Sequence, residues 1–321
     1  MLQESLQQIT EELRKFRGLS RKSCIGDILK VFGEREFDDA GFLDIDDFYI
    51  VVSTDGITED LVKADPWLAG YYSVLVNVND VVVKGAKPLG YVNVVSSPNS
   101  QTRLMIAKGI EAALKKYGLK LLKGHTHPDT SYEAIDAAVI GVAKRIARSS
   151  TAKPGDSILL AVDLDGSFGQ KGWVKCFDST QHKSPEELRQ MLFTVIDVVE
   201  SSLVTASRDV SAPGIIGSIA MLCESSNVGA SINLEAVPKP ENTSIVDWLT
   251  AYPALGFIFT TSKARECLRL LESKGYHVSV IGEVNNTKKI TLQYRGESEI
   301  FADLNTESIF GFRKPIHPCL P

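Results

Sequence analysis

Apolar positions along the chain recur at two spacings, and together these predict a protein of mixed helices and strands. Near the amino terminus, an amphipathic helix is predicted by apolar residues spaced three and four positions apart, namely Leu2, Leu6, Ile9, Leu13 and Phe16. Gly18 is the predicted end of that helix. The same spacing predicts helices at 66–84, 102–117, 185–203, 215–223 and 262–273.

Strands are predicted where short apolar runs lie between turn residues. These runs occupy 41–45, 48–53, 91–95, 134–143, 157–162, 256–261, 276–281 and 289–294, and 230–237 is expected to be extended. Strands and helices are mixed in both halves of the chain. The fold class expected in each half is therefore a layered α/β or α+β architecture.

A polar segment at 148–156, RSSTAKPGD, contains a Pro-Gly pair and separates the two halves. A chain of 321 residues is long enough for two domains that each bury a core. We therefore expect an N-terminal domain at 1–148 and a C-terminal domain at 149–321.

Composition narrows the possible partners. The net charge is −5, from 35 basic and 40 acidic residues, so no nucleic-acid or membrane partner is expected. The five cysteines occur singly and without a CxxC pair, which argues against a disulfide framework or a thiolate zinc site. The first 16 residues are too acidic for a signal peptide, and a cytoplasmic protein is expected.

The first candidate for chemistry is an acidic group near the predicted strands at 41–53. Asp38 and Asp39 precede these strands, and Ser53-Thr54-Asp55-Gly56 follows them. Asp55 is expected at a strand end beside a glycine turn. Carboxylates from several strand ends suit Mg²⁺, a hard cation that takes oxygen ligands. The alternative is that Asp and Gly simply form turns.

The second candidate is the polar group Asn77-Val78-Asn79-Asp80 within the otherwise apolar helix predicted at 66–84. Asp80 follows Asn77 by three residues, which places both on one helix face. Buried polar groups need partners. Those partners are either a ligand or a structural hydrogen-bond network, and an exposed helix face is the other possibility.

A third candidate is the polar segment 123–130, KGHTHPDT, expected to be a loop after an apolar strand. Its two histidines have no further ligands at zinc-site spacing, so surface or substrate contact is expected for them. A fourth candidate is Asp209, in a segment leading into the helix at 215–223. Asp209 or Ser211 could cap that helix, or the helix start could seat an anion.

The order of these short motifs resembles the aminoimidazole-ribonucleotide synthetase superfamily. Its members include thiamine-monophosphate kinase, selenophosphate synthetase and the hydrogenase-maturation dehydratase HypE. The resemblance is carried in the first half by Asp-Asp-Ala, Ser-Thr-Asp-Gly, Asn-x-x-Asp, Gly-Ala-x-Pro, Gly-His-Thr and Lys-Pro-Gly-Asp. The second half agrees through ASRDVSAPGIIGSIAMLCESSNVGASINL and SKGYHVSVIGEV.

The resemblance implies a two-domain PurM-like fold, an N-terminal sheet that forms a barrel in a homodimer, and bound ATP and Mg²⁺. It implies three metal ligands, Asp39, Asp55 and Asp80. Nucleotide-site positions carried over from the family are Ser53, Thr54, Asn77 and Gly124. Catalytic positions are Asp209 and the acid of the 123–130 loop, for which His125 and Asp129 both stay open.

Some positions depart from the named members. Lys123 replaces a glycine of the loop, and Ala212 replaces the second acid that thiamine-monophosphate kinase carries. The resemblance implies an Mg²⁺-dependent, ATP-using enzyme that phosphorylates or phosphate-activates a small molecule, and the sequence does not identify that molecule. The alternatives are an inactive nucleotide-binding sensor and a HypE-like carbamoyl dehydratase that uses Cys319.

Overall fold

The computed structural model describes residues 4–34, 37–169 and 172–318, and the chain divides into two compact units. Unit 1 comprises Met1–Asp38, Ala147–Leu164 and Ser202–Pro321. Unit 2 comprises Asp39–Ile146 and Asp165–Ser201. Each unit draws on residues from both sides of position 148, and a domain boundary at that position stays a prediction.

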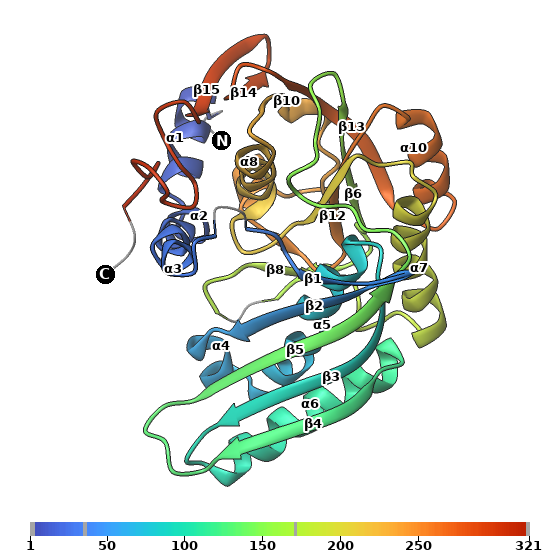
Figure 1. Ribbon diagram of the computed structural model, residues 1–321. Helices are drawn as coiled ribbons and strands as arrows, with labels where there is room; N and C mark the ends of the chain where they lie inside the picture. Colours follow the sequence, from blue (N-terminus) through green and yellow to red (C-terminus); the bar gives the residue numbers. More distant parts are fainter. Residues whose placement is uncertain (1–3, 35–36, 170–171, 319–321) are drawn as a thin grey trace. The chain divides into compact units, whose positions relative to one another are not determined.

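Unit 2 is built on a five-stranded sheet in the order β1-β2-β5-β3-β4. Its strands are β1 (Gly41–Ile45), β2 (Phe48–Ile57), β3 (Lys87–Ser96), β4 (Lys120–His127) and β5 (Ala134–Ala143). β3 and β4 are parallel, and the other neighbouring pairs are antiparallel. In Figure 1 these strands run side by side, with β4 at one edge.

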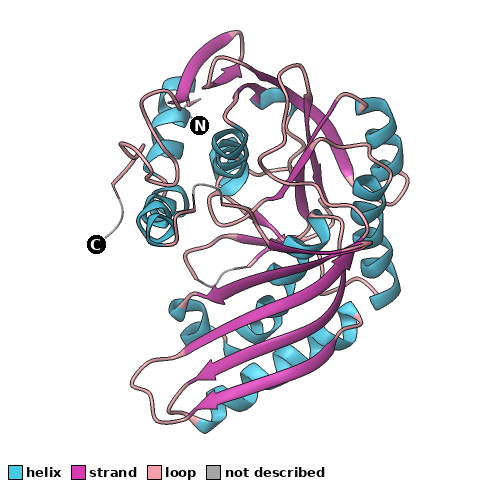
Figure 2. Cartoon of the chain, viewed as in Figure 1, coloured by secondary structure: helices cyan, strands magenta, loops and turns pink. Residues whose placement is uncertain are grey.

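Helices cover one face of this sheet (Figures 1 and 2). They are α4 (Glu59–Ala64), α5 (Pro66–Val83) and α6 (Ser100–Tyr117), and α7 (Pro185–Glu200) packs on α5 and α6. α5 contacts β2, β3 and β5, and α6 packs on α5. Asp65 caps α5 by accepting a hydrogen bond from the Leu68 amide, and Pro66 fixes its first turn. Short strands β7 (Ser167–Phe168) and β8 (Cys176–Asp178) pair antiparallel.

Unit 1 contains a seven-stranded sheet in the order β15-β14-β10-β13-β6-β12-β9. Its strands are β6 (Ser157–Val162), β9 (Ala206–Asp209), β10 (Gly229–Asn233), β12 (Gly256–Thr261), β13 (His277–Asn285), β14 (Lys289–Tyr294) and β15 (Glu297–Asp303). β10 and β14 are parallel, whereas the other neighbours are antiparallel. β6 and β12 are buried almost throughout, as central strands of a covered sheet should be.

The helices of unit 1 pack around this sheet. They are α1 (Leu6–Lys15), α2 (Arg17–Ser20), η1 (Arg21–Cys24), α3 (Ile25–Val31), α8 (Gly214–Ser226), η2 (Leu234–Ala236), α9 (Ile245–Leu249) and α10 (Ala264–Glu272), and a short strand β11 is Tyr252–Pro253. α8 contacts β9 and β10, and α10 contacts β13 and β6. Within the described ranges, no helix is both long and apolar enough to cross a bilayer.

The expected fold class is confirmed: both units are mixed layers of helices and sheet. The expected strand at 134–143 and the expected helix at 102–117 are present, the latter as α6, which ends before Gly118 in the left-handed conformation. Three local expectations were wrong. Gly18 does not stop a helix, because α2 includes it and it packs against the Ala212 carbonyl. Residues 123–127 belong to strand β4, and 230–237 is a short strand followed by η2.

Candidate active site

The polar residues of α5 are buried, because this helix is enclosed on most sides. Asn77, Asn79 and Asp80 have exposed fractions of 0%, 0% and 6%. The alternative of an exposed helix face is therefore wrong. Burying such groups costs about 1–3 kcal/mol each if they lack partners, so their partners determine what this part of unit 2 can do.

Ser53 of β2 supplies a partner for Asp80. Its Oγ donates to Asp80 Oδ2 at 2.6 Å and lies 3.2 Å from Asn77 Oδ1. A hydroxyl has one proton, so it can serve only one of these acceptors at a time. Asn77 in turn donates from Nδ2 to the Ser73 carbonyl at 2.9 Å. The serine, the amide and the acid thus form one buried network across β2 and α5.

Asp39 lies just before β1 and has a charged partner. Lys84 Nζ lies 3.0 Å from Asp39 Oδ2, and the exposed fractions of the two side chains are 0% and 3%. Lys84 is the residue at which α5 ends, four positions after Asp80. A buried ion pair of this kind persists only with close geometry, since each charge has lost its water.

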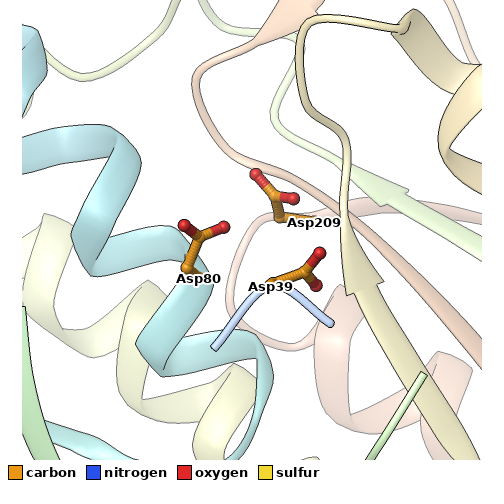
Figure 3. Close-up of side chains that lie close together, drawn as sticks. All are labelled: Asp39, Asp80 and Asp209. Atoms are coloured by element: carbon orange, nitrogen blue, oxygen red, sulfur yellow. The ribbon is translucent and has the colours of Figure 1, made fainter. Parts of the chain in front are cut away.

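Asp39 and Asp80 come close to each other within unit 2. Each has a carboxylate oxygen within 4.8 Å of the other's. Figure 3 shows Asp80 on α5 and Asp39 on the neighbouring segment. Two buried carboxylates at this separation repel unless a cation neutralises them. Oxygen donors in this arrangement fit Mg²⁺, which prefers carboxylate ligands.

Thr54 and Asp55 lie inside β2, not at its end. Thr54 Oγ1 donates to the Ala137 carbonyl at 3.0 Å, a contact within the sheet. Asp55 is exposed and stands opposite Ala137 of β5. The strand continues to Ile57, so the expected turn at Asp55-Gly56 is absent. Side chains alternate along a strand, which places Asp55 on the same sheet face as Ser53.

Gly124, His125 and Asp129 lie at the far edge of the same sheet. Asp55 faces Ala137, Ala137 faces Asn93, and Asn93 faces Gly124. Strands are about 4.8 Å apart, so Asp55 and Gly124 are separated by roughly 14 Å of sheet. The sequence-predicted residues of the N-terminal half therefore form two groups, one around Asp80 and one on β4.

The β4 group borders a cavity of about 390 Å³ between β3, β4 and α6. Asn93, Arg103, Gly124, His125 and Thr126 contribute to its wall. The His125 and His127 rings lie 4.6 Å apart. In the part of the chain that the structure describes, neither histidine belongs to a group of three potential metal ligands. This cavity suits a small organic molecule better than a metal ion.

Asp209 is the last residue of β9 in unit 1. It is 2% exposed and stands opposite Phe257 of β12. α8 begins five residues later, at Gly214, and no side chain caps it. The expectation that Asp209 or Ser211 caps this helix was therefore wrong. Gly214 has φ +75°, and a side chain there would meet the Leu249 carbonyl, so the turn before α8 requires glycine.

The cysteines described as free are buried. They are Cys176, Cys223 and Cys267. Burial raises the pKa of the Cys223 thiol to about 12, which leaves it protonated and unreactive at neutral pH. Cys319, the residue of the carbamoyl-transfer alternative, lies outside the described residues.

Known families match both halves of the chain. Residues 37–143 match the model of the AIR synthase related protein N-terminal domain, and residues 153–295 match that of the C-terminal domain. This chain belongs to the AIR synthase-related family. The family assignment confirms the resemblance that the motifs predicted.

Individual proteins and solved structures are similar to this chain to different degrees. The uncharacterized protein MJ0640 of Methanocaldococcus jannaschii is 34% identical over 96% of this chain and 99% of its own length. A thiamine-monophosphate kinase of Pyrococcus horikoshii is 33% identical over 40% of this chain and 43% of its own length. The solved structure of Thermotoga maritima PurL complexed with ADP superimposes with a TM-score of 0.78. It is 19% identical, and the match covers 95% of this chain and 52% of PurL, which confirms the PurM-like fold.

Lys84 is the site residue that sequence reasoning missed. The sequence does show a lysine, Lys84, directly after the apolar run Val81-Val82-Val83. A lysine at that position is ordinarily interpreted as a solvent-exposed residue at the end of a helix, since cations are favoured near helix C-termini. Only the fold reveals that Asp39, 45 positions earlier, lies beside it.

Proposed function

We propose that this protein uses ATP and Mg²⁺ to phosphorylate or phosphate-activate a small-molecule acceptor, as a kinase or a dehydrative synthetase. The observation that carries the proposal is the buried Asp39–Asp80 pair, with oxygens within 4.8 Å, inside the segment matched by the family's N-terminal domain. The relatives support it: one is a thiamine-monophosphate kinase, and one similar solved structure is a PurL complex with ADP.

The residues around this pair have distinct proposed roles. Asp39 and Asp80 would hold Mg²⁺, and Ser53 would orient Asp80 by donating to its Oδ2. Magnesium, when bound, supplies the positive charge that phosphoryl transfer needs. Asn77 fixes the position of the network through its hydrogen bond to the helix backbone. Thr54 is held to the sheet at Ala137 and has a supporting role in this proposal.

The acceptor's place in this proposal is the cavity beside β4. Its wall is largely apolar and carries a few polar groups, among them Arg103, Asn93 and His125. This combination suits a molecule of metabolite size that has an apolar part and a polar group. His125 of β4 is proposed for the role that the resemblance gives to segment 123–130, and Asp129 follows β4 by two positions. Asp209, in unit 1, is proposed as a further catalytic acid on its motif alone. The Asp209→Asn variant should bind ATP but turn it over more slowly.

The decisive experiment is a thermal-shift and calorimetric titration of the full chain with ATP, with and without Mg²⁺. A ligand that binds only the folded state stabilises it by about 2.7 kcal/mol at a hundredfold excess over Kd. A shift that requires Mg²⁺ supports the proposal, and ADP or phosphate release can then be screened across acceptors. Binding without turnover for any acceptor would favour the nucleotide-sensor alternative. No shift from a folded sample would refute the proposal.

We also propose that the protein is a homodimer formed through the sheet of unit 2. Val51 and Val95 are buried beneath the helices, so by alternation Val52 and Val94 face the opposite side. Leu43 joins them, because it pairs through Ile50 on the same face. Leu43, Val52 and Val94 are 58%, 39% and 37% exposed. Light scattering should give twice the chain mass of 35.1 kDa, and Val52→Lys should return it to the monomer value.

A further inference from the structure

Lys84 is buried beside the two carboxylates and has no role in the family resemblance drawn above. Its side chain is 0% exposed, and Nζ lies 3.0 Å from Asp39 Oδ2. Lys183 of unit 2 is also buried, at 4% exposed, but its partners Asp165 and Glu187 are 73% and 53% exposed. Lys63 and Lys115 pair with glutamates one helix turn earlier and are 59% and 74% exposed. Those pairs belong to the surface, where ion pairs contribute little.

The position of Lys84 relative to Asp80 is fixed by the helix. The two residues are four positions apart, so they occupy the same side of the last turns of α5. Asp39 and Asp80 bring two negative charges within 4.8 Å, and Lys84 brings one positive charge. Within unit 2, Lys84 therefore supplies one of the positive charges that this carboxylate pair requires.

The contact also affects how a metal ion can approach the two carboxylates. Lys84 occupies Asp39 Oδ2, and Ser53 donates to Asp80 Oδ2. A carboxylate oxygen has two lone pairs and accepts more than one partner. However, an ammonium at Oδ2 repels a second cation approaching the same oxygen. Lys84 therefore opposes the approach of a second cation to the carboxylate pair.

We propose that Lys84 is a positioning residue that serves as the resident cation of this site. It neutralises Asp39, holds it in place and weakens the attraction of the Asp39–Asp80 pair for a free divalent cation. The inference rests on the proposed function, because it assigns the charges of that same site. Its consequence is weak binding of free divalent ions, so that the metal enters together with the phosphates of the nucleotide.

The test measures Mn²⁺ binding to the nucleotide-free full chain by electron paramagnetic resonance, with Mn²⁺ as the probe for Mg²⁺. Lys84→Met removes the charge and keeps an unbranched side chain. It should bind Mn²⁺ about tenfold or more tightly than the wild type, because a nearby positive charge is gone and Asp39 is released. The matched control is Lys84→Met combined with Asp39→Asn, which removes both charges. Its affinity should return to within about threefold of the wild type.

Each result decides the inference. Unchanged or weaker Mn²⁺ binding by a folded Lys84→Met protein would overturn it and leave Lys84 a structural residue. If Lys84→Met unfolds without metal, refolding by millimolar Mn²⁺ supports the inference, and failure to refold overturns it. The proposed function is judged separately, by Mg²⁺-dependent ATP binding to the wild type. Normal ATP binding with no gain in Mn²⁺ affinity would reject Lys84 as a resident cation and keep the function.

Discussion

Carboxylates that are buried or part-buried occur in both units, and they are stabilised in different ways. In unit 1, Glu224 of α8 accepts hydrogen bonds from Ser308 Oγ at 2.5 Å and from the amides of Ile309 and Phe310 at 2.6 and 3.1 Å. Burial is the largest influence on this acid and raises its pKa despite these donors. In unit 2, Asp39 has an ammonium and Asp80 a hydroxyl, and the two acids lie close together.

The difference separates a structural acid from one suited to binding. Glu224 receives three donors from one short segment, so its oxygens are used to hold residues 308–310 against α8. The Asp39–Asp80 pair carries two negative charges, and Lys84 supplies one positive charge. A site that retains negative charge when folded attracts a cation, whereas a carboxylate satisfied by a loop does not. Variants of the two kinds of acid should therefore affect different measurements.

Asp80→Asn should produce the largest change in ligand binding. The amide removes the charge nearest to Ser53 while keeping the size of the side chain. We expect Mg²⁺-dependent ATP affinity to fall by tenfold or more, equivalent to about 1.4 kcal/mol or more. Calorimetric titration with ATP at saturating Mg²⁺ measures this directly.

The matched control for Asp80→Asn is Glu224→Gln, another acid-to-amide change at a buried position. It should keep the wild-type ATP affinity, because Glu224 lies in unit 1 and holds only its own segment. Equal loss of ATP affinity in both variants would show that the effect comes from general destabilisation. Unchanged affinity in Asp80→Asn, with the fold intact, would remove Asp80 from the site.

Glu224→Ala should produce the largest loss of stability without affecting ligand binding. Truncation leaves one hydroxyl and two backbone amides of the 308–310 segment without their acceptor. Unsatisfied buried donors cost about 1–3 kcal/mol, so the free energy of unfolding should fall by about 3 kcal/mol. Urea denaturation followed by circular dichroism measures the change. A loss below about 0.5 kcal/mol would mean that this segment is held by other contacts.

The raised pKa of Glu224 predicts a dependence of stability on pH. The folded state holds the Glu224 proton more tightly than the unfolded state, whose glutamate pKa is about 4.3. The Glu224 contribution to the free energy of unfolding should therefore decrease as pH rises from about 4.3 through the folded pKa, and stay constant above it. The Glu224→Gln variant has no carboxyl group at this position and therefore no titration there. The difference between wild type and variant, measured by urea melts across pH 4 to 8, should show this decrease and no increase.

Sequence patterns predicted the elements better than the site. The apolar run of α5 and the strand at 134–143 were readable because their spacing is local. The edge strand β4 was taken for a loop at 123–127, because an exposed edge strand needs no apolar face and its composition is polar. The Asp39–Lys84 contact could not be read at all, since it joins positions 45 apart through the packing of α5 on the sheet. The order of the motifs identified Asp39, Asp55 and Asp80 together. Only the geometry separates the Asp39–Asp80 pair from Asp55.

Asp55→Asn should therefore have the smallest effect of this series. Family resemblance grouped Asp55 with Asp39 and Asp80, yet it is exposed, lies inside β2 and stands opposite Ala137. An exposed carboxylate keeps its water and contributes about 0–1 kcal/mol to a nearby cation, so ATP affinity at saturating Mg²⁺ should fall by no more than about fivefold. The same titration used for Asp80→Asn measures it. If Asp55→Asn instead matched the loss in Asp80→Asn, Asp55 would be a full metal ligand, and the nucleotide-bound site would reach from α5 along β2 to its exposed end.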